Sequence, residues 1–306
     1  MQKSNLDSQR KLMNKLKYFK KWSDRDGNIY SLDMLRLNID VGDNLKALNG
    51  YIQGLADVDL RYEIKYYPSF AQYKYRHLWN VSSPIDDGVS LSLGLDLGGS
   101  AEARHKGFIE FNPNKCETSS LLHGFIARVM SYCVTVDLVR YDLAIDVLID
   151  RTLARLERFG RKHYQYIDSG NGITEYLGQR NTSGYIKLYD KTKESNLTDT
   201  YTRLEITLDS KTDISSVFPT VRLNDTQQAL PLDTDLSETD KVLIALLRKE
   251  ENPQYYLSQL LYRKRKKIEP YLADRVLNLD NKLALNVKTL ALYYENYYKR
   301  DFDKIQ

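Results

Sequence analysis

Cysteine and histidine are scarce in this chain of 306 residues. The two cysteines, Cys116 and Cys133, form no CxxC pair, and the four histidines stand apart without an HxH or HExxH spacing. We therefore expect reduced, structural thiols and no metal site built on histidine. Walker and Gly-x-Gly-x-x-Gly sequences are also absent, so this chain is not expected to use a nucleoside triphosphate.

Long apolar runs are missing as well. No stretch of 18 apolar residues occurs, and the basic segment "MQKSNLDSQRKLMNKLKYFKKW" at 1–22 lacks the apolar core of a signal peptide. The sequence thus predicts a soluble, cytoplasmic protein with no membrane partner. Its apolar content of 42% is sufficient for a globular core.

Positive charge is concentrated in patches, although the net charge is only +4. Residues 1–25 hold eight Lys and Arg against two acids, and 263–267 reads RKRKK. Such patches fit a polyanion such as nucleic acid, but a solvated helix face explains any one of them equally well. The 24 tyrosines favour nucleic acid slightly, because aromatic rings can stack on unpaired bases.

Many segments alternate apolar and polar residues, which is typical of half-buried strands. Strands are predicted at 29–41, 58–67, 89–97, 107–112, 138–147, 173–178, 184–190 and 201–209. Helices are predicted at 117–132 and 151–164, and "DSGNG" at 168–172 indicates a hairpin turn. Many strands with few helices between them predict an α+β fold, in which a largely antiparallel sheet with flanking helices forms the catalytic domain.

The C-terminal part has a different character. Residues 211–236 are rich in Thr, Asp and Pro and are predicted to be a linker or irregular lobe between a domain at 1–210 and one at 237–306. Ser237 is expected to cap a helix, with Asp240 at its third position. The last 70 residues therefore predict a smaller α-helical domain.

Charged residues recur on one face of four predicted strands, because alternate residues of a strand point the same way. This face is expected to carry Glu110, Arg140, Asp142, Asp146, Tyr185, Lys187, Tyr189, Arg203, Glu205 and Thr207. The simplest interpretation is a solvated sheet face. Yet the carboxylates Glu110, Asp142, Asp146 and Glu205 would repel one another if the strands are neighbours. A divalent cation, Mg²⁺ or Mn²⁺, would relieve that repulsion.

The stretch "GYIKLYDKTKE" at 184–194 places Tyr189 between Lys187 and Lys191. Forming a phenolate at pH 7 costs roughly three pKa units, or about 4 kcal/mol, and the two lysines are expected to lower that cost. Tyr189 is then a candidate nucleophile for a phosphodiester, with a phosphotyrosine product that permits rejoining. An ordinary half-buried sheet tyrosine remains the alternative.

Four blocks of this sequence resemble, in the same order, the trans-acting Rep family of rolling-circle plasmid replication initiators from Gram-positive bacteria. The blocks are "FIEFNPNK" (108–115), "VRYDLAIDV" (139–147), "EYLGQRNTSGYIKLYDKTKE" (175–194) and "TRLEITL" (202–208). The resemblance implies that Tyr189 is the nucleophile and that Asp142, Asp146 and Glu205, with Glu110 as a further candidate, are the active-site carboxylates that bind metal. It also implies a metal-dependent DNA nickase, related to relaxases.

The family's partners follow from the same resemblance. A homodimer is expected to bind a double-stranded origin, commonly inside its own gene, to open it to single-stranded DNA, and to recruit a host DNA helicase. Nicking leaves a free 3′-OH and a 5′-phosphotyrosine, and strand transfer later rejoins the ends. The residues expected to contact DNA are Arg263, Lys264, Arg265, Lys266, Lys267 and Arg180.

Three other functions stay open at the level of sequence. A relaxase of an integrative conjugative element would use the same chemistry. A non-catalytic origin-binding protein would be expected to have lost Tyr189 or the acidic strands, and this chain has lost neither. A metal-dependent nuclease would use water as its nucleophile, with Tyr189 as a structural residue.

Overall fold

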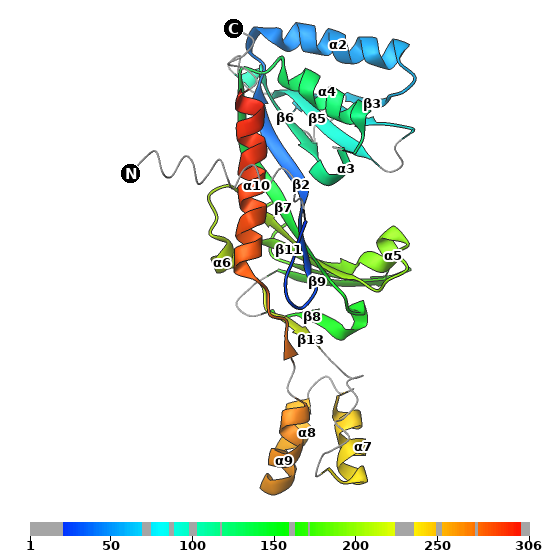
Figure 1. The fold of residues 1–306 in the computed structure, drawn as a ribbon, viewed down its shortest axis with the longest axis vertical. Helices are drawn as coiled ribbons and strands as arrows, with labels where there is room; N and C mark the ends of the chain where they lie inside the picture. The colour runs from blue at the N-terminus through cyan, green and yellow to red at the C-terminus, as the bar shows by residue number, and fades with distance from the viewer. Residues whose placement is uncertain are drawn as a thin grey trace, which may run out of the picture.

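The computed structural model describes residues 21–68, 75–85, 89–97, 103–116, 118–158, 163–170, 172–223, 236–248, 253–272 and 275–300. Within these ranges the main feature is an antiparallel sheet of eleven strands, in the order β3-β4-β5-β6-β2-β7-β12-β11-β10-β9, with β1 paired to β2 (Figure 1). A second sheet of three strands has the order β14-β13-β8. The predicted α+β fold with a largely antiparallel sheet is confirmed.

The elements have the following bounds. The strands are β1 (Lys21–Ser23), β2 (Ile29–Asp40), β3 (Glu63–Pro68), β4 (Tyr75–Ser82), β5 (Ser90–Leu97), β6 (Lys106–Phe111), β7 (Thr135–Val147), β8 (Ala154–Leu156), β9 (Tyr164–Ser169), β10 (Gly172–Leu177), β11 (Tyr185–Asp190), β12 (Thr202–Leu208), β13 (Val221–Leu223) and β14 (Arg275–Val276). The helices are α2 (Leu45–Val58), α3 (Pro113–Cys116), α4 (Ser120–Met130), α5 (Lys191–Ser195), α6 (Ile214–Val217), α7 (Glu238–Leu247), α8 (Pro253–Ser258), α9 (Tyr262–Ile268) and α10 (Asn281–Arg300).

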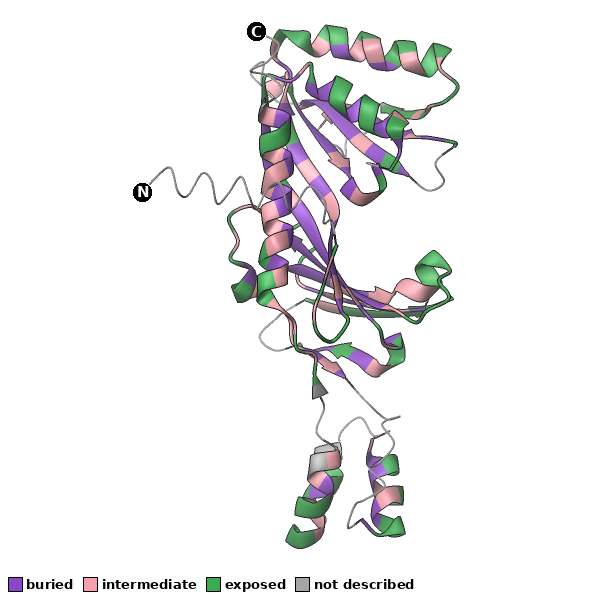
Figure 2. Ribbon diagram, viewed as in Figure 1, coloured by how far each residue is buried: buried purple, intermediate pink, exposed green. Residues whose placement is uncertain are grey.

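Helices cover one face of the large sheet. Helix α10 packs along β7 and β2, and α4 and α2 contribute to the same core (Figures 1 and 2). The residues of α4 that are buried there have helical spacing: Leu122, Phe125, Ile126 and Val129. Because the helices occupy the apolar face, the charged residues of β7, β11 and β12 are left on the other face.

Two β-bulges interrupt the pairing of β2 with β7 and keep the apolar side chains of these long strands directed to the core. In β2 the register shifts between Leu32 and Met34, so the bulge leaves Asp33 without a partner on β7. Buried positions therefore change from even numbers, such as Leu32, to odd numbers, such as Leu35 and Leu37. Bulges of this kind re-aim side chains, and this one directs Asp33 to the charged face.

The predicted helix at 151–164 is wrong. Residues Arg151–Leu153 form a 3-10 turn, 154–156 form β8, and β9 begins at Tyr164, while 159–162 lie outside the described residues. Strand β8 pairs with β13, and its alternate residues Ala154 and Leu156 are buried. This long-range pairing overrides the helical spacing of the local sequence.

Other expectations were met with changes. Strand β4 and helix α2 were not anticipated. Residues 1–20 of the basic segment at 1–22 lie outside the described residues. The turn at "DSGNG" does join β9 to β10 in a hairpin. Ser237 caps α7 in a capping box with Asp240, as predicted.

The helices after residue 236 fall into two groups. Buried residues of α7, α8 and α9 form a small core of their own, made of Leu236, Ile244, Leu247, Leu257 and Ile268. Helix α10 packs instead on the large sheet. The predicted domain boundaries, at residues 210 and 236, stay a prediction. The segment between them, predicted to be a linker, contains α6 and β13. In the described part of the chain, no helix has the length and apolar character needed to span a lipid bilayer.

Candidate active site

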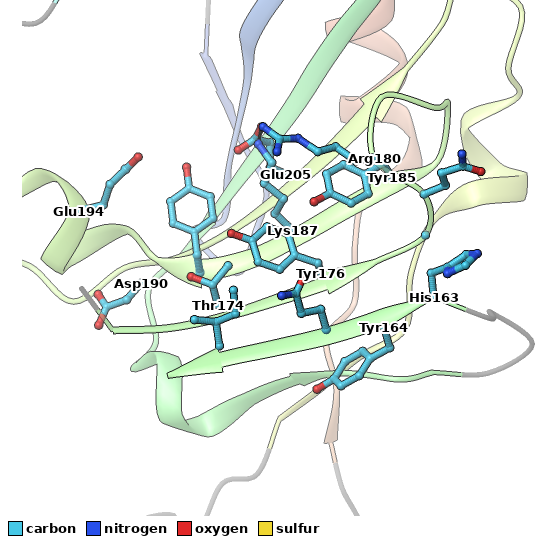
Figure 3. Close-up of a pocket in the computed structure, with 15 residues that line it drawn as sticks. His163, Tyr164, Thr174, Tyr176, Arg180, Tyr185, Lys187, Asp190, Glu194 and Glu205 are labelled. Atoms are coloured by element: carbon cyan, nitrogen blue, oxygen red, sulfur yellow. Dashed lines mark hydrogen bonds and ion pairs between the residues drawn. The ribbon is translucent and has the colours of Figure 1, made fainter. Parts of the chain in front are cut away.

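A groove of about 1000 Å³ lies over β9, β10, β11 and β12 (Figure 3). Its walls include Tyr176, Arg180, Tyr185, Lys187, Tyr189, Glu194 and Glu205. Most of these residues come from the charged face predicted from strand alternation. Its volume is at the upper end of the range for small-molecule sites, about 300–1000 Å³.

Strand register brings three charged or nucleophilic residues into one row. Tyr189 of β11 is opposite Arg203 of β12, and Arg203 is opposite Asp146 of β7. The Arg203 guanidinium binds Asp146 through two bonds, Nε to Oδ1 at 2.5 Å and Nη2 to Oδ2 at 2.8 Å. Such a bidentate pair fixes the guanidinium plane beside Tyr189.

The "FNPNK" segment anchors the other side of Arg203. Arg203 donates from Nη1 to Asp33 Oδ1 at 2.9 Å, and Asn112 Nδ2 donates to the same oxygen at 3.2 Å. Asn114 Nδ2 bonds the Leu32 carbonyl at 2.6 Å, next to the bulge. Both asparagines of the segment therefore hold the β2 bulge in the position that lets Asp33 reach Arg203.

Tyr189 is half-buried, and its surroundings favour the neutral phenol over the phenolate. Burial raises the pKa of Tyr189 well above its ordinary value, and the Glu205 carboxylate raises it further. The nearby Arg203 guanidinium opposes both by lowering that pKa. The cation that favours the phenolate is thus Arg203, whose role the sequence did not single out.

The two lysines expected to activate Tyr189 are both ion-paired. Lys187 Nζ donates to Glu205 Oε1 at 2.6 Å, and Lys191 is bound to Glu194. Burial lowers the pKa of Lys187, but the attraction of Glu205 outweighs it and the net shift is upward. Lys187 therefore stays charged and neutralises Glu205.

The residue after the nucleophile candidate has a local structural role. Asp190 is the N-cap of α5, and its side chain accepts a hydrogen bond from the Lys193 amide at 2.9 Å. N-capping of this type is the common use of Asp at a strand-to-helix junction. The "YDKTKE" sequence is thereby explained as the last strand residues, the cap and the first turn of a short helix.

The four predicted carboxylates are not assembled into one cluster. Strand β2 lies between β6 and β7, and Glu110 pairs there with Arg36 at 3.2 Å and Arg140 at 2.8 Å. Asp146 is held by Arg203. No group of three or more His, Cys, Asp or Glu that could hold a metal ion is found among the described residues.

Asp142 and Glu205 do form an interacting pair. Burial raises the pKa of Asp142 to about 7, and the repulsion of Glu205 adds to the shift. The Oδ1 atom of Asp142 is buried without a hydrogen-bond partner. Two carboxylates, one with an unpaired oxygen, fit the protein share of a Mg²⁺ site in which substrate phosphates supply further ligands.

A buried ion pair behind the groove was missed by sequence reasoning. Arg151 Nη2 contacts Glu175 Oε1 at 2.6 Å, and both side chains are almost fully buried. Arg151 also donates from Nε to the Leu188 carbonyl at 3.2 Å, next to Tyr189. No sequence signal could have found this pair, because Arg151 and Glu175 meet only through the long-range packing of segment 151–156 against β10.

The residues predicted to bind DNA lie in two places. Arg180 is exposed at the rim of the groove, whereas Arg263, Lys264, Arg265, Lys266 and Lys267 all belong to α9. In α9, Lys264 and Lys267 are bound to Asp240 of α7, and Arg265 faces Glu269 at 3.4 Å. Arg263, Lys266 and Lys267 are the exposed members of the run, and of these Lys267 is the one bound to Asp240.

Comparisons with known proteins add little to this geometry. No family model matches the chain, and no curated protein matches it. Among solved structures, a rolling circle replication initiator protein from Geobacillus stearothermophilus is similar at 16% identity and a TM-score of 0.37, over 81% of this chain and 100% of that chain. A likeness of this size does not establish a common fold or a common activity.

Proposed function

We propose that this protein is a plasmid rolling-circle replication initiator that nicks one strand of its origin with Tyr189. The observation that carries the proposal is the row of Tyr189, Arg203 and Asp146, whose first member, Tyr189, lines the groove. A structural tyrosine would not need a fixed guanidinium beside it. The four sequence blocks that resemble the trans-acting Rep family support the same function.

The proposed chemistry is a transesterification. The Tyr189 oxygen attacks the phosphorus, and the bond from phosphorus to the 3′ oxygen breaks, which leaves a 5′-phosphotyrosine and a free 3′-OH. Overall, the proton lost by Tyr189 appears on the 3′ oxygen. Arg203 favours the phenolate during attack, because a fixed positive charge beside a developing anion stabilises it.

A divalent cation is part of the proposal. Mg²⁺ or Mn²⁺ would be held by Asp142 and Glu205, with Asp146 and Glu110 retained by their arginine partners. When bound, such an ion supplies Lewis-acid polarisation of a phosphoryl oxygen. Lys187 Nζ lies 2.6 Å from Glu205 Oε1, so the proposed ligand has a cation beside it.

The partners proposed are a double-stranded origin, the single strand exposed when it opens, a second copy of the chain and a host DNA helicase. Arg180, which lines the groove, is proposed to contact the single strand, and Arg263 and Lys266 of α9 are proposed to contact the duplex. A relaxase of an integrative conjugative element would use the same site. A non-catalytic origin-binding protein would have no use for the Arg203 anchoring.

The test is an adduct assay on supercoiled DNA that carries this protein's own gene, with Mg²⁺ or Mn²⁺ added. The protein is digested after the reaction, and any peptide bearing a nucleotide is located by mass spectrometry. An adduct on the "LYDK" peptide that disappears in Tyr189→Phe is the expected result. Tyr201→Phe, next to β12 but outside the groove lining, is the matched control and should keep the adduct.

Two results would contradict the proposal. Nicking that persists in Tyr189→Phe, with no adduct, would make water the nucleophile and the protein a metal-dependent nuclease. Binding of the same DNA with neither nick nor adduct would favour the non-catalytic origin-binding protein.

A further inference from the structure

Two tyrosines in the groove have no role in the chemistry proposed above. Tyr176 of β10 and Tyr185 of β11 stack with ring centroids 6.1 Å apart and ring planes within 12° (Figure 3). Both rings belong to the groove wall. Tyr176 is half-buried and Tyr185 is buried, so the Tyr176 ring is the more exposed of the two in the groove wall.

Their position relates them directly to Tyr189. Tyr176 is opposite Lys187 in the strand register, and Tyr185 is on the same strand face as Lys187 and Tyr189. A strand rises about 3.3 Å per residue, so Tyr185 lies about 13 Å along β11 from Tyr189. Tyr176, which is opposite Lys187, lies beside the midpoint of that distance. This separation corresponds to a few nucleotides of an extended strand.

The chemistry of the pair points to a ligand with a flat face and polar edges. Neither hydroxyl has a hydrogen-bond partner among the described residues, so both remain able to bond a ligand. Arg180, exposed at the same wall, is close enough for its charge to lower the pKa of Tyr185 against the effect of burial. An aromatic surface with a cation beside it suits an unpaired base and its phosphate.

We propose that Tyr176 and Tyr185 form a stacking site for an unpaired base within a few nucleotides of the phosphate that Tyr189 attacks. This inference rests on the proposed function, in that it takes the groove as the path of a DNA strand. It adds to the proposed function a specific contact, in which a base of the opened strand lies against these rings near the cleavage point. A paired base in a duplex cannot lay its face on the rings.

The test uses the full chain and a fluorescein-labelled thymidine oligonucleotide of about twelve nucleotides, with affinity measured by fluorescence anisotropy. Tyr176→Leu should weaken binding about ten-fold, because each stacked base contributes strongly to single-strand affinity. Tyr176→Phe and Tyr185→Phe keep the ring and should bind within about two-fold of the unchanged protein. Tyr67→Leu, an exposed tyrosine of β3 at the opposite end of the sheet, is the matched control.

A duplex of the same length distinguishes stacking from general attraction to DNA. Its affinity should be unchanged in Tyr176→Leu. Equal weakening for duplex and single strand would overturn the inference, and so would unchanged single-strand binding in a Tyr176→Leu variant that circular dichroism shows to be folded.

The two proposals fail separately. If adducts form on Tyr189 while the leucine variant binds the oligonucleotide normally, the stacking site is wrong and the nickase stands. If the leucine variant loses single-strand binding while no adduct forms, the stacking site stands and the nucleophile is wrong.

Discussion

Arg203 shows how one residue can organise a site without binding the substrate first. Three of its bonds go to two carboxylates, Asp146 and Asp33, so its position is fixed without any ligand. A guanidinium can make such a planar fork, whereas a lysine cannot. Pre-organised charge of this kind is more effective than a mobile charge, because no reorganisation is needed during the reaction.

The buried carboxyl of Asp142 predicts an unusual dependence of stability on pH. Its pKa rises from 3.8 to about 7 in the folded protein, so the folded state keeps a proton that the unfolded state releases. Stability should therefore fall as the pH rises from about 4 to about 7. Asp142→Asn, which cannot ionise, should raise the free energy of unfolding at pH 8 by up to about 4 kcal/mol, with little change at low pH.

Urea unfolding at several pH values, with EDTA present, measures this effect. Asp59→Asn provides a control of opposite sign, because Arg61 lowers the pKa of Asp59 and its ionised form favours folding. An Asp142→Asn variant that is less stable than the unchanged protein at pH 8 would show that the folded state prefers the ionised carboxyl.

At the scale of the element, the β2 bulge connects a sequence motif to the active site. Asn112 and Asn114 follow β6 and bond β2 at Asp33 and Leu32. A regular strand would keep Leu32 and Leu35 on opposite faces, so the two could not both be buried in the same core. The bulge therefore serves both the core and the orientation of Asp33.

Removing one of these anchors should slow the reaction more than it destabilises the fold. Asn112→Ala deletes the bond to Asp33 and the bond that Asn112 Oδ1 accepts from the Lys115 amide, and it frees Asp33 and Arg203 to shift. We expect adduct formation in a single turnover to slow about ten-fold, because small misplacements of positioning groups are costly. The free energy of unfolding should fall by only about 2 kcal/mol, the usual net contribution of two hydrogen bonds.

Asn44→Ala is the matched control for this change. Asn44 Nδ2 donates to the Tyr132 carbonyl at 3.0 Å, so the control loses a comparable bond on another part of the fold. It should leave the adduct rate unchanged. An Asn112→Ala variant with a normal rate would show that the bulge contributes to stability alone.

At the scale of the whole molecule, the polar face of the sheet and the α7–α9 unit are the two surfaces that carry the proposed contacts with DNA. In α9 the five basic residues are not equivalent. Lys264 and Lys267 neutralise Asp240, which also caps α7, and their proximity lowers the pKa of Asp240. They hold the two helices together, which leaves Arg263 and Lys266 for an external anion.

Substitution within α9 should therefore separate binding from folding. A double change of Arg263 and Lys266 to alanine should weaken binding of an origin duplex and reduce the slope of log affinity against log salt by about 2. The free energy of unfolding should not change. Anisotropy titrations between low and moderate salt measure both quantities.

The double change of Lys264 and Lys267 to alanine is the comparison. It leaves Asp240 buried without its cations and should destabilise the helical unit. If it instead lowers the salt slope with no loss of stability, those lysines contact DNA and the assignment within α9 is reversed.

The sequence by itself determined what is local. Strand alternation predicted that Asp142, Lys187, Tyr189 and Glu205 share the charged face, since side chains of a strand alternate with a fixed period of two. It also predicted the capping box at Ser237, because a capping box is made within one turn. These predictions needed no knowledge of which strands are neighbours.

Tertiary structure decided the rest. Which strands pair depends on contacts between residues that are far apart in the chain. Only the tertiary structure could therefore place β2 between β6 and β7 and pair Glu110 with two arginines. The same pairing made a strand of 154–156 and buried Arg151 behind Tyr189. The charges that surround the nucleophile candidate are therefore set by long-range register, because a local pattern fixes the face of a residue and not its partner.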